Sequence, residues 1–162
     1  MLEIIKKENI LVNQEPRDWE DSITLVGEVL ENAGSIENAY THAMIAAVKQ
    51  HGPYIVIGKH FAIAHAAPEV YVRNNDMAVA ILAKPVDFGS QNDPVKVLFA
   101  IASVDGKSHL EKLMELVRIV SEDEGIINHL SECTTKEAVY AIINGENNGR
   151  VPLSHRKGSC VE

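Results

Sequence analysis

Two short runs of the sequence, 76–83 and 95–104, are β-rich and almost continuously apolar. A strand that is apolar at nearly every position, rather than at every second one, is typical of a sheet covered on both faces. A third run, 54–57, has the same character, and the Pro- and Gly-containing stretch 84–94 predicts a surface loop. These runs therefore predict a central sheet with a layer on each side.

Helical periodicity surrounds these runs. Asp18, followed by an acidic residue three positions on, predicts the start of a helix over 18–32, and a second helix is expected from near Asn38 to the terminator at Gly52. In the C-terminal half, three Ser/Thr-x-x-Glu pairs predict three more helices. They begin at Ser108, Ser121 and Thr134. The order helices, strands, helices predicts an α/β fold, a single-domain sandwich with a central mixed sheet flanked by helices.

Two surfaces follow from these patterns. The first of the C-terminal helices is expected to pack on the sheet through one apolar face, with charged residues on the other. That predicted face consists of Leu110, Leu113, Met114, Val117 and Val120. Phe61 and Ile63 are expected to form an exposed apolar patch suited to brief docking of a partner.

The chain has 162 residues and a formal net charge of −8, so one domain is expected, without affinity for nucleic acid. No apolar run is long enough to cross a bilayer, and the N-terminal residues do not resemble a signal peptide, so a cytoplasmic protein is expected. The composition becomes polar and Gly-rich from 144 onward. We therefore expect a domain over 1–143 and a mobile polar tail over 144–162.

Histidine is the unusual residue type of this chain, with seven copies. The motifs GxGxxG, GxxxxGK[ST], GxSxG and HExxH are all absent, which leaves nucleotide-binding and metalloprotease functions without support. His60 and His65 lie an odd number of residues apart, so a regular strand would point them to opposite faces. No metal site and no cofactor are therefore expected.

His65 stands among alanines at positions 62, 64, 66 and 67. Such small side chains would let another macromolecule bring a bulky group close to the imidazole, which suits a nucleophile. The alternative is a half-buried structural histidine at the end of a strand. Spacing alone does not decide between the two interpretations.

His109 is predicted to lie on the first turn of a helix, where unpaired N–H groups and the helix dipole attract anions. A phosphate near that helix end could accept hydrogen bonds from His109 and from the backbone. The alternative is a solvent-facing residue with no such role.

With these residues in view, the chain resembles the enzyme IIA component of the bacterial phosphoenolpyruvate-dependent sugar phosphotransferase system. The resemblance covers roughly 1–143 and is to the mannitol/fructose superfamily, most of all its ascorbate branch. It rests on His51-Gly52-Pro53-Tyr54, Ala62-Ile63-Ala64-His65-Ala66-Ala67-Pro68-Glu69, Pro85-Val86-x-Phe88, Asn92-Asp93-Pro94-Val95, and Val104-Asp105 leading into Ser108-His109-Leu110.

The resemblance implies a phosphotransferase in which His65 accepts a phosphoryl group from the carrier protein HPr and passes it to the cysteine of an enzyme IIB. His109 would stabilise that group, and Lys49 and Ser108 would help to bind it. The membrane would be reached only through a IIC permease. Which sugar is carried, and whether the chain forms a homodimer, stay open.

Three positions depart from the pattern of the family. His60 stands where many relatives have Gly, Ala64 where many have Pro, and Lys49 where relatives of the mannitol and nitrogen-regulatory types have Arg. Lys49 offers a point charge without the planar fork of Arg. Two further interpretations stay open, a regulatory binding module of the nitrogen type switched by phosphorylation, and a scaffold with inert histidines.

Overall fold

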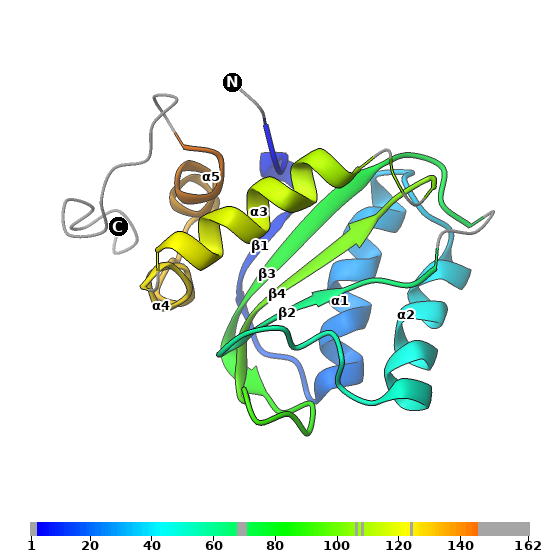
Figure 1. The fold of residues 1–162 in the computed structure, drawn as a ribbon, viewed down its shortest axis with the longest axis horizontal. Coiled ribbons are helices and arrows are strands. Elements are labelled where there is room, and N and C mark those ends of the chain that lie inside the picture. The colour runs from blue at the N-terminus through cyan, green and yellow to red at the C-terminus, as the bar shows by residue number, and fades with distance from the viewer. Residues whose placement is uncertain (1–2, 68–70, 106, 108, 124, 146–162) are drawn as a thin grey trace.

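Four strands form one mixed sheet in the order β1-β3-β4-β2 (Figure 1). The strands are β1 (Ile10–Gln14), β2 (Phe61–Ala64), β3 (Asp76–Val86) and β4 (Val95–Ala102). The pairs β1–β3 and β2–β4 are parallel, whereas β3 and β4 are antiparallel. The structure, a computed structural model, describes residues 3–67, 71–105, 107, 109–123 and 125–145. The predicted tail over 144–162 thus lies outside the described residues, apart from its first two positions.

Helices cover both faces of the sheet, α1 and α2 on one side and α3 to α5 on the other (Figure 1). Their bounds are α1 (Trp19–Asn32), α2 (Asn38–His51), α3 (Leu110–Glu122), α4 (Ile126–Ser131) and α5 (Lys136–Asn144), with a short 3₁₀ helix η1 (Lys7–Asn9) before β1. This arrangement confirms the predicted α/β sandwich with a flanked mixed sheet. None of the helices in the described part of the chain has the length and apolar character needed to cross a bilayer.

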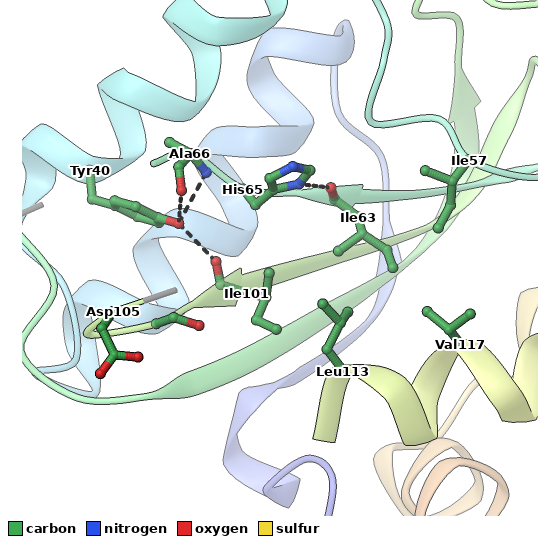
Figure 2. Close-up of a pocket in the computed structure, with 10 residues that line it drawn as sticks. Tyr40, Ile57, Ile63, His65, Ala66, Ile101, Asp105, Leu113 and Val117 are labelled. Atoms are coloured by element: carbon green, nitrogen blue, oxygen red, sulfur yellow. Dashed lines mark hydrogen bonds between the residues drawn. The ribbon is translucent and has the colours of Figure 1, made fainter. Parts of the chain in front are cut away.

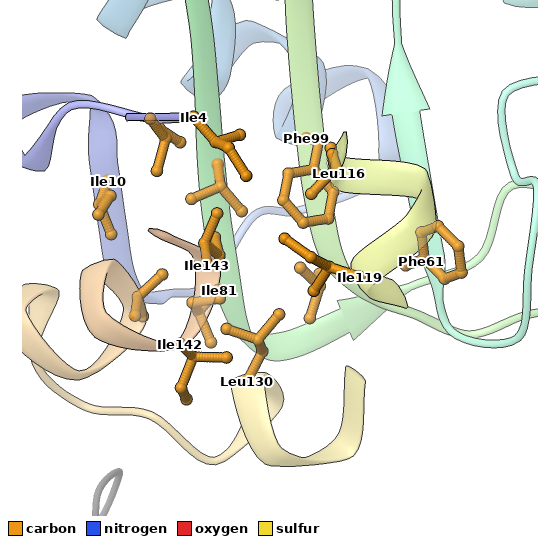
Figure 3. Close-up of a cluster of buried hydrophobic side chains, with 14 of the residues drawn as sticks. Ile4, Ile10, Phe61, Ile81, Phe99, Leu116, Ile119, Leu130, Ile142 and Ile143 are labelled. Atoms are coloured by element: carbon orange, nitrogen blue, oxygen red, sulfur yellow. The ribbon is translucent and has the colours of Figure 1, made fainter. Parts of the chain in front are cut away.

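The two faces of the sheet carry side chains of different size. The face toward α1 and α2 is rich in buried alanine, namely Ala62, Ala64, Ala78, Ala80, Ala100 and Ala102. Larger side chains such as Phe99 and Ile81 cover the other face and pack against α3 to α5 (Figure 3). The expectation that alanines at 62 and 64 form an open collar around His65 was therefore wrong, because both are fully buried. The small alanine side chains on this face let α1 and α2 approach the sheet closely.

The segment 54–57 is a turn rather than the predicted strand. The N–H groups of Tyr54 and Val56 donate to Gly52 O and Pro53 O, so the backbone is satisfied locally. Ile55 O still accepts a hydrogen bond from Ile63 N of β2. Strand β1, in contrast, was not predicted.

Helix α3 packs on the sheet through a different face from the one predicted. Leu116 and Ile119 are buried, with Leu113 and Val120 partly buried beside them. Three members of the predicted face are exposed instead: Leu110, Met114 and Val117. The helix carries two apolar stripes, and contact with the sheet selects one of them. Phe61 and Ile63 are also buried, at 8% and 4% exposure, so they do not form the predicted docking patch.

His60 has a positive φ of 71°. A side chain with a Cβ pays roughly 1–2 kcal/mol for this left-handed conformation, whereas Gly adopts it freely. Two contacts hold His60 in place: its N–H donates to Asn92 O, and its Nδ1 lies 2.8 Å from Pro94 O. The surrounding backbone thus holds a non-Gly residue in a conformation that Gly would adopt freely.

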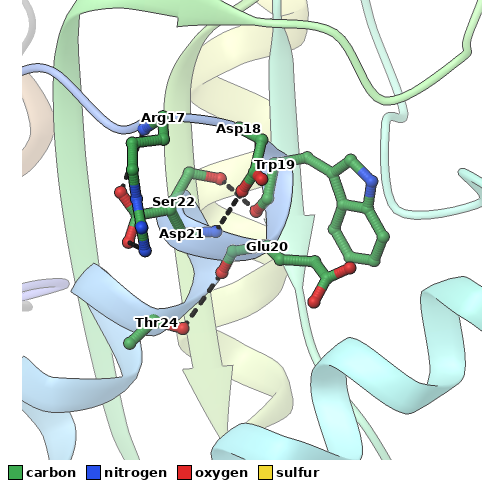
Figure 4. A network of polar contacts seen from close by, with 7 residues as sticks. All are labelled: Arg17, Asp18, Trp19, Glu20, Asp21, Ser22 and Thr24. Carbon is green, nitrogen blue, oxygen red and sulfur yellow. Dashed lines mark hydrogen bonds and ion pairs between the residues drawn. The ribbon is translucent and has the colours of Figure 1, made fainter.

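The start of α1 follows the sequence signal closely (Figure 4). Asp18 is the N-cap, and its carboxylate accepts a hydrogen bond from Asp21 N at 2.9 Å. The C-terminal helices begin at other residues than predicted. Thr135, rather than Thr134, caps α5. Ser121 lies inside α3, and Ser108 lies outside the described residues.

Replacing Asp18 by Ala should lower the free energy of unfolding by about 1 kcal/mol, because the first turn of α1 loses its side-chain acceptor. Asp18→Ser retains an acceptor and should stay within a few tenths of a kcal/mol of the original chain. Urea unfolding of the three proteins checks this. An unchanged stability in Asp18→Ala would contradict the role of this cap.

Candidate active site

One edge of the sheet gathers the polar residues that the sequence pointed to. Strands β2 and β4 are parallel, with Ala64 opposite Ala100, so their carboxyl ends lie at the same edge. His65 follows β2 directly, and His109 follows β4 after a short loop. The structure therefore brings the two predicted histidines to the carboxyl ends of neighbouring strands, which is where ligands bind in many α/β proteins.

His65 is half-buried, and its imidazole is anchored through one nitrogen. Its Nδ1 lies 2.8 Å from the carbonyl oxygen of Ile63, two residues back along the chain. A carbonyl only accepts, so Nδ1 carries the proton in this hydrogen bond. In the neutral imidazole the lone pair is then on Nε2, so this is the ring atom that could act as a nucleophile.

A buried tyrosine braces the chain just after His65 (Figure 2). The Tyr40 hydroxyl accepts a hydrogen bond from Ala66 N at 3.1 Å and donates to Ile101 O of β4 at 2.9 Å. Burial raises the pKa of Tyr40 above its usual value, so the hydroxyl keeps its proton. The brace ties the residue after His65 to the neighbouring strand. In the sequence, Tyr40 is only one of several apolar residues spaced along this helix.

A cavity of about 310 Å³ opens beside His65 (Figure 2). Its lining is mostly apolar and comes from β2, β4, α2, α3 and the loops next to them: Tyr40, Ile57, Ile63, His65, Ala66, Ile101, Ser103, Asp105, Leu113 and Val117. Two residues of this lining, Ile57 and Val117, are exposed. Two further exposed apolar residues, Leu110 and Met114, lie on the same side of α3 as Val117 by helical spacing. We call these four residues the α3 rim. The His65 imidazole therefore lies beside an apolar surface.

His109 is buried, with only 4% of its surface exposed, so the solvent-facing alternative was wrong. It is the N-cap of α3, and its Nδ1 lies 3.1 Å from Ala102 O. Burial lowers the pKa of His109 below its usual value, and the hydrogen bond to Ala102 opposes this shift. The nearby charges act in opposite directions, Lys112 lowering the pKa and Asp76 raising it.

A buried carboxylate lies at the same edge of the sheet. Asp76 pairs across the sheet with Ala102, the residue whose carbonyl holds His109. Its oxygens accept hydrogen bonds from Ser35 Oγ at 2.6 Å and from Asn9 Nδ2 at 2.8 Å. One signal for this residue was available in the sequence, a charged side chain at the head of an otherwise apolar strand.

Two other predicted residues are not shown to join the site. Lys49 Nζ lies 3.5 Å from Glu20 Oε2, with both side chains largely exposed, and Lys49 does not line the cavity. Ser108 lies outside the described residues. In the described part of the chain, no group of three or more His, Cys, Asp or Glu residues is arranged to hold a metal ion.

Comparison with known proteins finds a matching family model and similar curated relatives. A family model described as "Phosphoenolpyruvate-dependent sugar phosphotransferase system, EIIA 2" matches residues 3–146. The ascorbate-specific PTS system EIIA component of Shigella boydii is 33% identical over 146 residues, which cover 89% of this chain and 94% of that protein. These matches confirm the resemblance seen in the sequence, including its ascorbate branch.

Solved structures share the fold. The mannitol-specific cryptic phosphotransferase enzyme IIA of Escherichia coli superposes with a TM-score of 0.80 at 22% identity, covering 90% of this chain and 100% of that one. The complex of the E. coli mannitol enzyme IIA with phosphorylated enzyme IIB gives a TM-score of 0.76 at 23% identity, covering 88% and 98%. At these identities the comparison supports the architecture alone.

His109 should titrate with a midpoint below about 6.5, the usual pKa of histidine, because its imidazole is buried. The pKa of His109 is lower in the folded chain than in the unfolded chain. At a pH between these two pKa values, the unfolded chain therefore binds more protons than the folded chain. The free energy of unfolding should therefore fall as the pH is lowered through 6.5. A ¹H–¹⁵N NMR titration, with His109→Gln to assign the signal, measures the midpoint. A midpoint above 6.5 would contradict the burial of this side chain.

Proposed function

The chain belongs to the EIIA 2 family of the phosphoenolpyruvate-dependent sugar phosphotransferase system, and from this membership we propose that it is a phosphocarrier acting through His65. His65 accepts a phosphoryl group from the phosphohistidine of HPr and passes it to the cysteine of an enzyme IIB. The named relatives are ascorbate-specific, so ascorbate is the proposed sugar. The protein would act in the cytoplasm, with a IIC permease as its only link to the membrane.

The observation that carries this proposal is the hydrogen bond from His65 Nδ1 to Ile63 O. It fixes the tautomer in which Nε2 holds the lone pair, and it does so beside a cavity where a partner can approach. Nε2 attacks phosphorus as the P–N bond to the donor histidine breaks, and the donor nitrogen recovers its electron pair. The Nδ1 proton stays where Ile63 O holds it, so no separate base is needed.

His109 is the proposed partner in stabilising the phosphoryl group. Its hydrogen bond with Ala102 O leaves a lone pair, not a proton, on Nε2 while the imidazole is neutral. An arriving phosphoryl group brings negative charge to the sheet edge, which favours a protonated His109. Uptake of that proton would let Nε2 donate to a phosphoryl oxygen. Lys49 and Ser108 stay proposals for the same task.

The α3 rim, defined above, is the proposed docking surface for both partners. It replaces the patch that was predicted from Phe61 and Ile63, which the core buries. A carrier must release its donor and its acceptor quickly, and small interfaces of this kind give weak and transient complexes. An apolar rim next to the nucleophile lets each partner exclude water from the reacting groups.

Replacing His65 by Gln should abolish phosphate acceptance without unfolding the chain, since the nucleophile is lost from a half-buried position. Intact-protein mass after incubation with phosphoenolpyruvate, enzyme I and HPr measures this. His42→Gln, which changes an exposed histidine, is the matched control and should accept one acid-labile phosphoryl group. An adduct on His65→Gln would overturn the assignment.

Phosphoryl transfer from the phosphorylated chain to purified enzyme IIB distinguishes a phosphocarrier in sugar transport from a regulatory binding module. A carrier should phosphorylate that partner. Normal acceptance from HPr with no onward transfer would favour the regulatory module instead.

A negative charge on the α3 rim should weaken docking. Met114, the most exposed of the four rim residues at 61%, is the best position for this change. Met114→Glu should raise the KM for phospho-HPr by about tenfold, because a carboxylate must be desolvated on binding, and Met114→Leu should leave it nearly unchanged. Steady-state phosphorylation rates at varied phospho-HPr provide both values. Equal KM values for the two variants would exclude this helix from the interface.

A further inference from the structure

The motif His51-Gly52-Pro53-Tyr54 has no role in the chemistry proposed so far. It joins α2 to the segment that leads into β2. Gly52 has a φ of 84°, which favours glycine, and its N–H donates to Val48 O as α2 ends. The N–H of Tyr54 then donates back to Gly52 O at 2.8 Å. This tight turn carries Tyr54 toward the sheet edge where His65 lies.

The Tyr54 ring contacts the His65 imidazole directly. The ring centroids are 5.3 Å apart and the planes are almost perpendicular, at 86°. The Tyr54 hydroxyl also donates to the backbone carbonyl of His65 at 3.3 Å. The same ring also meets the imidazole of His51, with 6.2 Å between centroids and an angle of 83°. The Tyr54 ring therefore contacts two imidazoles.

This contact is not a by-product of core packing. Tyr54 is 41% exposed and belongs to neither of the two buried clusters of the sandwich. A perpendicular aromatic pair is attractive beyond the area that it buries, so it biases the orientation of a half-buried ring. The hydrogen bond from Nδ1 to Ile63 O fixes one edge of the imidazole, and the Tyr54 ring restricts its rotation out of that bond.

We propose that Tyr54 is a positioning residue for phosphoryl transfer, whose ring keeps the His65 imidazole in the orientation that presents Nε2 to the donor. This inference rests on the proposed function of His65. In-line attack tolerates little angular error, so loss of the restraint lowers the rate within the bound complex. The His65 imidazole reacts only after phospho-HPr has docked, so its orientation should not change the affinity for phospho-HPr.

The test compares Tyr54→Ala with Tyr54→Phe. Tyr71→Ala, which removes another exposed tyrosine, serves as the matched control. We expect the rate at saturating phospho-HPr to fall about tenfold in Tyr54→Ala, with KM within twofold of the original chain. Tyr54→Phe keeps the ring and should stay within twofold in both quantities, as should Tyr71→Ala. Thermal unfolding confirms that all three variants fold.

Three results would overturn the positioning role. A change confined to KM would make Tyr54 a docking residue instead. An equal loss in Tyr54→Phe would show that the ring is not what matters, and an equal loss in Tyr71→Ala would show a general effect of surface changes.

A second readout needs no phosphoryl transfer. In the unphosphorylated chain, ¹⁵N NMR of the His65 ring should show the Nδ1–H tautomer, and Tyr54→Ala should show both tautomers in exchange. If the original chain accepts no phosphate at all, the proposed function fails while this measurement still decides whether Tyr54 orders the imidazole. Identical ring spectra in the two proteins would contradict the inference.

Discussion

Parallel pairing of the short strand β2 with β4 is the constraint on which the rest of the site depends. The pair is buried on both faces, and its alanines on one face allow α1 and α2 to lie close to the sheet. Because both strands run in the same direction, their carboxyl ends meet at one edge. His65 and His109 come from different parts of the sequence, and the direction of the two strands places both at that edge.

The sheet edge is then held by polar groups that are themselves satisfied. The Tyr40 hydroxyl forms hydrogen bonds with both Ala66 and Ile101, and these bonds hold the segment after β2 against β4. Asp76, buried at the start of β3, accepts hydrogen bonds from Ser35 and from the N-terminal segment. Buried polar groups of this kind are costly unless each finds a partner, and once paired they fix one arrangement. The result is a rigid edge next to an exposed apolar helix face, which suits a carrier that meets two partners in turn.

Much of the fold could be predicted from the sequence, because runs of apolar residues and a cap such as Asp18 act locally. The family could also be predicted, since its motifs are short and ordered. Other features depend on tertiary contact. Helix α3 has two apolar stripes, and only docking on the sheet decides that Leu116 and Ile119 are buried while Met114 is exposed. The brace from Tyr40 and the partners of Asp76 join segments far apart in the chain, which no local pattern reveals.

In the proposed function, the hydrogen bond to Ile63 O leaves Nε2 of His65 as the reacting atom. The most direct measurement is ¹⁵N and ³¹P NMR of the phosphorylated chain, with ring nitrogens labelled, to find which nitrogen of His65 carries phosphorus. The account predicts phosphorus on Nε2 and a proton retained on Nδ1. Phosphorus on Nδ1 would contradict it, because that nitrogen would have to leave Ile63 O before reacting.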